Sequence, residues 1–115
     1  MAKILIAEDN EKNLELFKTI IESLGHQILT ARNGQEAIEI AKNETPDLIL
    51  MDIQMPVMDG KSALKMLRCE EKTRNIPVIA LTSYAMKGDR EHCLKLGFAD
   101  YISKPIELES FTETI

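Results

Sequence analysis

One stretch near the middle of the chain, Leu48–Gly60, constrains the fold more than any other. Its apolar start leads directly into the carboxylate of Asp52, and Pro56 and the pair Asp59-Gly60 follow soon after. A short apolar run is typical of a buried strand, whereas proline and Asp-Gly are turn signals. The pattern therefore predicts a strand that presents Asp52 at the edge of a sheet. Taken alone, most aspartates in such places only cap a turn.

Apolar runs alternate with helical periodicities along the rest of the chain. We expect strands at residues 3–7, 27–31, 48–52, 76–81 and around 101–102, and helices at about 11–24, near 37–41, at 61–70, at 86–96 and from 107 onward. The first helix should turn one stripe to the core, made of Leu14, Phe17, Ile21 and Leu24. The alternation indicates an α/β fold with a mostly parallel sheet and helices on both faces.

Composition and charge exclude several classes of protein. The 115 residues are enough for one domain, and 44% apolar with 29% charged residues indicates a globular chain. A net charge of −5 argues against nucleic-acid binding. No apolar run approaches the roughly 20 residues that cross a bilayer. Neither cysteine has metal-binding spacing, so we expect free thiols and a cytoplasmic protein.

Polar residues follow the predicted strands where each one ends. They are Glu8 and Asp9 after the first strand, Asp52 after the third, Thr82 after the fourth and Lys104 after the fifth. In a parallel sheet these ends meet at one edge, where ligands bind. Three carboxylates brought together there repel one another unless a cation lies between them. An oxygen-only set that keeps some water suits Mg²⁺ better than Ca²⁺.

The hydroxyl and the ammonium at the same edge would complete a site for a phosphoryl group. The sequence has neither a GxGxxG nor a GxxxxGK[ST] loop, so we do not expect a nucleotide to bring that group. A carboxylate nucleophile such as Asp52 can carry it covalently instead. Phosphoryl transfer requires mostly positioning and charge neutralisation from the protein.

These residues resemble the receiver domain of two-component response regulators. The resemblance covers the whole chain and rests on Glu8-Asp9, Asp52 with Met55-Pro56 and Asp59-Gly60, Thr82, Tyr101 and Lys104-Pro105. It implies a flavodoxin-like (βα)5 fold, doubly wound, with a five-stranded parallel sheet in the order 2-1-3-4-5. The chain resembles stand-alone receivers, such as the chemotaxis and cell-division types, in having no output domain. This implies a single receiver domain over residues 1–115, without an output domain, that acts as a monomer.

The resemblance also implies the chemistry of the site. Asp52 would accept the phosphoryl group, with Mg²⁺ as the cofactor. Asp9 would bind Mg²⁺ directly, Glu8 would hold it through water, and the backbone carbonyl of Gln54 would supply a further ligand. Lys104 would pair with the phosphoryl oxygens. The acid pair is Glu-Asp rather than the commoner Asp-Asp, and the longer glutamate changes the expected metal geometry without changing the assignment.

The resemblance further implies how the signal passes through the domain. Thr82 and Tyr101 would form a switch pair that responds to the phosphoryl group. The donor would be a phosphohistidine of a histidine kinase or a histidine phosphotransfer protein. The signal would leave by contact with a downstream effector protein, and the domain would catalyse only its own phosphorylation and slow autodephosphorylation.

Two alternatives remain open at this point. A Mg²⁺-dependent phosphatase with an aspartyl intermediate would need a second acid two residues after Asp52, where the chain has Gln54. A receiver-like binding module that is not phosphorylated should have lost an acid or the lysine, and neither is lost.

Leu16 lies off the predicted core stripe of the first helix, because each residue advances the helix by about 100°. We therefore expect it to be exposed beside the active edge. Our hypothesis is that Leu16, together with Asn10 and Asn13, docks the histidine-bearing donor.

Overall fold

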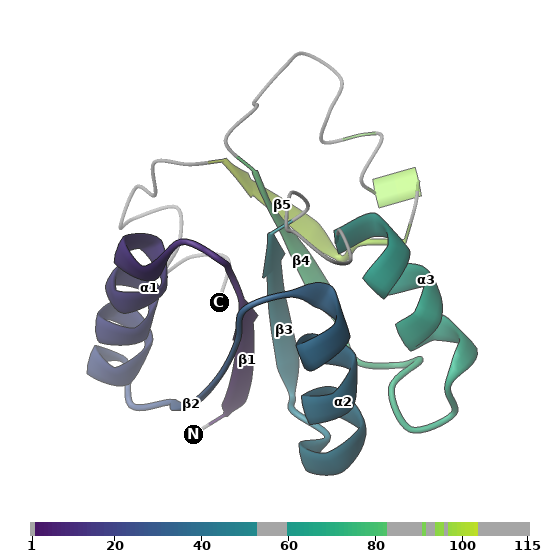
Figure 1. The fold of residues 1–115 in the computed structure, drawn as a ribbon, viewed down its shortest axis with the longest axis horizontal. Helices are drawn as coiled ribbons and strands as arrows, with labels where there is room; N and C mark the ends of the chain where they lie inside the picture. The colour runs from purple at the N-terminus through teal and green to yellow at the C-terminus, as the bar shows by residue number, and fades with distance from the viewer. Residues whose placement is uncertain (1, 53–59, 83–90, 92–93, 96, 104–115) are drawn as a thin grey trace.

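The sheet has five parallel strands, and helices lie on both of its faces (Figure 1). The computed structural model describes residues 2–52, 60–82, 91, 94–95 and 97–103. Its elements are β1 (Lys3–Ala7), α1 (Glu11–Ser23), β2 (Gln27–Ala31), α2 (Gly34–Glu44), β3 (Leu48–Asp52), α3 (Gly60–Cys69), β4 (Val78–Thr82) and β5 (Asp100–Ser103). The strand order is β2-β1-β3-β4-β5, which confirms the predicted doubly wound α/β fold.

The predicted boundaries hold for most elements, with one shift in β4. This strand begins at Val78, which pairs with Ile49, rather than at Ile76. The Ile76 N–H instead donates to the Thr73 carbonyl at 3.1 Å and closes a turn. Of the fourth predicted helix, Glu91 and residues 94–95 are described and are helical. The last predicted helix lies outside the described residues.

The sheet separates two apolar layers, because successive side chains of a strand point to opposite faces. Figure 1 shows α1 on one side of the sheet and α2 with α3 on the other. Buried residues on the α1 side are Ile4, Ile6, Leu14, Phe17, Ile21, Leu50, Ile79 and Leu81. Those on the other side include Leu5, Ala7, Ala37, Ile38, Ala41, Ile49, Met51, Ala63, Leu64 and Leu67. The α2 and α3 residues in this second list are the ones that pack these helices on the sheet.

The end of α1 corrects one prediction. Leu24 was expected on the core stripe, but it is 40% exposed. The helix ends at Ser23, and Leu24 is its C-cap with non-helical backbone angles. Gly25 then takes a positive φ of 85°, which glycine adopts without strain, so the chain turns away before another helical position is reached.

Arg68, in the last turn of α3, donates hydrogen bonds to three backbone carbonyls in two separate segments. Its Nη1 donates to the carbonyls of Arg74 at 3.0 Å and Ile76 at 2.8 Å, and its Nη2 donates to the carbonyl of Gly97 at 3.3 Å. Burial lowers the pKa of the guanidinium from its usual value. Beside it, the fully buried Thr73 donates its hydroxyl to the Leu67 carbonyl at 2.6 Å. Arg68 therefore fixes the loop before β4 against the turn that leads to β5.

Replacing Arg68 by methionine is expected to lower the free energy of unfolding by about 1–3 kcal/mol, because three carbonyls lose a charged donor. Urea unfolding measures this loss. Arg74→Gln is the matched control, since that side chain is exposed and only its backbone carbonyl takes part. It should change the stability by less than about 0.5 kcal/mol. Equal losses in the two variants would contradict the role given to Arg68.

Candidate functional site

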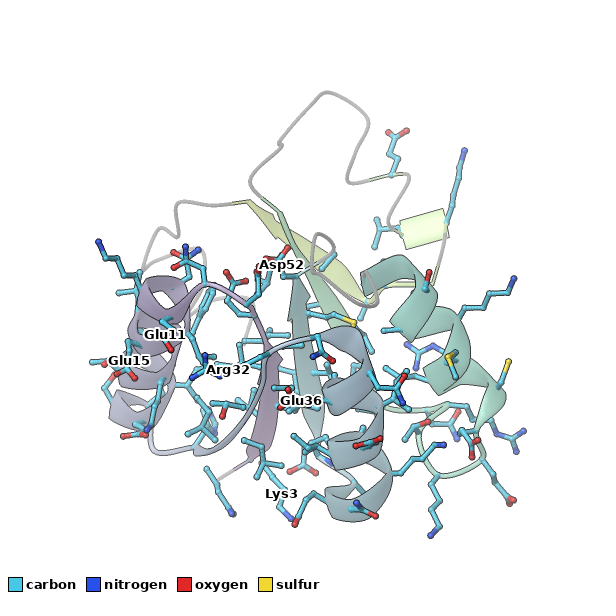
Figure 2. The ribbon with its side chains drawn as sticks, in the orientation of Figure 1. Lys3, Glu11, Glu15, Arg32, Glu36 and Asp52 are labelled. Carbon is cyan, nitrogen blue, oxygen red and sulfur yellow. The ribbon has the colours of Figure 1, made fainter. Side chains whose placement is uncertain are left out.

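The order of the strands places the ends of β1, β3 and β4 side by side. Ala7 pairs with Met51, and Asp52 pairs with Leu81, so the residue after Ala7 lies next to Asp52. Ile6 and Leu50 both face α1. Glu8 comes two residues after Ile6, and Asp52 comes two residues after Leu50. Because side chains two residues apart on a strand point to the same face, Glu8 and Asp52 both point to the α1 side of the sheet. Figure 2 shows Asp52 at the upper end of β3.

Three carboxylates meet at this edge. Glu8 is 1% exposed and Asp52 is 4% exposed, whereas Asp9 is exposed to solvent. One oxygen atom from each of the three lies within 4.8 Å of the others. Like charges this close repel, and a cation between them relieves the repulsion. Because every donor is a carboxylate oxygen, the cluster fits a hard divalent cation.

The backbone and α1 hold Glu8 in place. Its N–H donates to the Ala31 carbonyl of β2 at 2.9 Å. Its Oε1 accepts a hydrogen bond from the side-chain Nδ2 of Asn13 at 3.1 Å. The half-buried Asn13 therefore contacts the acid cluster itself, which the docking hypothesis did not foresee. The sequence does hold a signal for this contact, because Asn13 lies in the first turn of a helix that begins two residues after the acid pair.

The other two residues of the docking hypothesis lie on the surface of α1 or at its start. Asn10 is the N-cap, and its side chain accepts from the Asn13 N–H at 3.1 Å. Leu16 is 47% exposed, which confirms its predicted position off the core stripe. Whether these residues bind a donor stays a prediction.

The remaining predicted site residues are described in part or not at all. Thr82 is the last residue of β4, and its backbone is in register with Ser103. Tyr101 lies in β5, in register with Ala80. Lys104 and Gln54 lie outside the described residues, so their roles stay predictions. β4 therefore ends, with Thr82, at the same edge of the sheet that carries the three carboxylates.

A family model for the response regulator receiver domain matches residues 4–115. The chain belongs to this family. The polar-differentiation response regulator DivK of Brucella anthropi is 48% identical over 112 residues, which is 97% of this chain and 91% of DivK. The receiver domain is therefore a signalling domain of two-component systems and phosphorelays rather than a metabolic enzyme, as its motifs predict.

Solved receiver structures share the fold of this receiver domain. One is the receiver domain of the sensor histidine kinase PA1611 from Pseudomonas aeruginosa, with a magnesium ion coordinated in the active site cleft. It has a TM-score of 0.89 and 38% identity, covering 98% of this chain and 93% of that one. Another is the receiver domain of Ssk1 from Saccharomyces cerevisiae, solved with the histidine phosphotransfer protein Ypd1. It has a TM-score of 0.87 and 30% identity, covering 98% of this chain and 85% of that one. Among the described residues, no helix combines the length and the apolar character that a membrane span requires.

Proposed function

We propose that Asp52 is the phosphoacceptor of this receiver domain and that Mg²⁺ is its cofactor. The observation that carries the proposal is the meeting of Glu8, Asp9 and Asp52, with oxygens within 4.8 Å of one another at the carboxyl edge of the sheet. The magnesium ion in the active site cleft of the related PA1611 receiver supports the choice of metal.

The transfer begins with a carboxylate oxygen of Asp52 attacking the phosphorus of a phosphohistidine. The new O–P bond forms as the P–N bond breaks, and the electron pair of that bond stays on the imidazole nitrogen. Asp52 is at the end of a strand and 4% exposed, so its backbone is fixed and water is kept from most of its surface. The product is an aspartyl phosphate, which the domain hydrolyses slowly.

The neighbouring residues prepare this step. Asp9 would hold Mg²⁺ directly, Glu8 would hold it through water, and the Gln54 carbonyl would add a ligand. The ion, when bound, would offset the negative charge of the phosphoryl oxygens. Lys104 would pair with the same oxygens. The position of Thr82 at the end of the strand next to β3 supports its role, together with Tyr101, as the switch pair.

A direct experiment is to incubate the protein with Mg²⁺ and acetyl phosphate and to measure its intact mass. One alkali-labile phosphoryl group per chain is the expected result. No adduct would favour a receiver-like module that is not phosphorylated. Hydrolysis of the donor without accumulation of an adduct would favour a phosphatase.

The phosphoryl donor is proposed to be a histidine kinase or a histidine phosphotransfer protein. The complex of the related Ssk1 receiver with Ypd1 supports this choice. We propose likewise that residues 1–115 form a single receiver domain that acts as a cytoplasmic monomer and signals by contact with a downstream effector protein. These points stay predictions.

Substituting Leu16 with lysine is expected to slow transfer from a phosphohistidine donor protein by about 10-fold or more. Leu16 is a 47% exposed side chain on α1, the helix whose first turn also contacts Glu8. About half of the Leu16 surface is left to bury in an interface, which is worth about 1 kcal/mol, and a lysine in its place would in addition lose hydration of its charge. The measurement is the rate of phosphotransfer from the donor protein, compared with the rate from acetyl phosphate.

Met66→Lys is the matched control, because Met66 is 44% exposed on α3 and the charge change is the same. It should leave both rates within about 2-fold of the wild-type values, since it lies on the opposite side of the sheet (Figure 1). Equal slowing of both donors by Leu16→Lys would overturn the docking role.

A further inference from the structure

Asn13 occupies the third helical position of α1, from which its side chain can reach groups that precede the helix. Its own N–H is held by the Asn10 side chain at 3.1 Å, which fixes the residue in the first turn. In a capping box, the side chain at this position returns to the N–H of the cap residue. Here its Nδ2 lies 3.1 Å from Oε1 of Glu8, two residues before the cap. The first turn of α1 is therefore tied to an acid of the cluster.

The type of donor matters for a cation site. An amide N–H stabilises an ionised carboxylate by hydrogen bonding but brings no positive charge. A lysine or arginine in the same place would neutralise Glu8 and compete with a cation. The acid Glu8 also has one more rotatable bond than an aspartate, so more conformational entropy must be lost to hold its carboxylate in one position. The hydrogen bond from Asn13 holds the Glu8 side chain before the cation binds. Less conformational entropy is therefore lost when the cation binds.

We propose that Asn13 is a positioning residue of the metal site: its amide orients the carboxylate of Glu8 and so strengthens the binding of a divalent cation by the cluster. The inference rests on the Mg²⁺ site of the proposed function and extends it to a residue of α1. Hydrogen-bond partners that orient metal ligands typically contribute about 10- to 100-fold in metal affinity, and the lower end of this range applies here because Glu8 would hold the ion through water. Asn13→Ala should therefore weaken cation binding by about 10-fold.

The test is a double-mutant cycle with Mn²⁺ as the probe, its free concentration followed by electron paramagnetic resonance. The four proteins are the wild type, Asn13→Ala, Glu8→Asp and the double variant. Glu8→Asp keeps an acid pair for the metal but draws the carboxylate back by one methylene, out of reach of the 3.1 Å contact. Asn13→Ala is expected to weaken Mn²⁺ binding about 10-fold in the wild type and by less than about 2-fold in the Glu8→Asp background.

Asn33→Ala is the control for a weakened helix start. The Asn33 side chain caps α2 by accepting from the Glu36 N–H at 2.9 Å. This variant should lower the midpoint of urea unfolding and leave the Mn²⁺ affinity unchanged.

Each other outcome has a definite meaning. If Asn13→Ala lowers the unfolding midpoint but binds Mn²⁺ as the wild type does, Asn13 serves only the helix and the inference is wrong. Equal weakening in both backgrounds shows that Asn13 does not act through Glu8, which also overturns it. If the wild type itself binds no Mn²⁺, the proposed metal site fails, and the inference fails with it. Wild-type binding without an effect of Asn13 leaves the proposed function intact.

Discussion

Asp52→Asn is expected to abolish the phosphoryl adduct and, at the same time, to make the protein more stable in the absence of divalent cations. The adduct is lost because an amide is not a nucleophile for phosphorus at neutral pH. The gain in stability follows from the cluster, where oxygens of the buried Asp52 and Glu8 lie within 4.8 Å. At an effective dielectric constant of about 20, two unit charges at this separation repel by roughly 3 kcal/mol.

The net gain should be smaller than this repulsion, because Asp52 takes part in a further interaction that the substitution would also change. We expect an increase of about 1–2 kcal/mol in the free energy of unfolding, measured with urea in the presence of a chelator. Intact-mass analysis after treatment with acetyl phosphate measures the adduct. The sign of the stability change is informative, since most substitutions of buried residues destabilise.

Asp47→Asn is the matched control for this substitution. Asp47 is exposed just before β3, and its Oδ2 accepts from the Lys3 N–H at 2.8 Å, which an asparagine oxygen can still do. The variant should be phosphorylated fully and should not gain stability. An adduct on Asp52→Asn would place the acceptor elsewhere, and a loss of stability would show that repulsion does not dominate the cluster.

The sheet and the acid cluster could be predicted from the sequence because both depend on local patterns. Each strand is a short apolar run, and parallel strands bring their carboxyl ends to one edge. Glu8, Asp9 and Asp52 are therefore brought together by the fold class alone, without knowledge of any side-chain contact. The exposure of Leu16 follows from helical periodicity in the same way.

Contacts that depend on the exact path of a loop or the last residue of a helix could not be predicted. Arg68 donates to carbonyls of two separate connections, and no periodicity relates these segments. The hydrogen bond from Asn13 to Glu8 crosses a helix cap and depends on where α1 begins. Leu24 is exposed because α1 ends one residue before it, and helix ends are the boundaries that sequence patterns locate least well.

Removal of divalent cations is expected to slow phosphorylation by acetyl phosphate at least about 100-fold. An incoming phosphoryl group is itself anionic, and it must approach Asp52 past Glu8 and Asp9, all within one cluster. Without a cation this approach brings like charges together at an edge where two of the three carboxylates are buried. A barrier higher by about 3 kcal/mol corresponds to a rate lower by about 100-fold. The measurement is the rate of adduct formation as Mg²⁺ is added stepwise to protein from which a chelator has removed divalent cations.

At a fixed Mg²⁺ concentration, Asp9→Asn should lower the rate of phosphorylation nearly as much as removal of the cation does. Higher Mg²⁺ should partly restore the rate, because the substitution weakens a ligand of the ion and leaves the nucleophile Asp52 in place. Glu15→Gln is the matched control. It also removes one negative charge, but Glu15 is exposed on α1 and lies away from Asp52 (Figure 2). Solvent and salt screen such a charge, so the rate should change by less than about 2-fold. If the two variants changed the rate equally, Asp9 would act only through the overall charge of the surface. A large effect of Asp9 alone, relieved by added Mg²⁺, identifies it as a ligand of the ion.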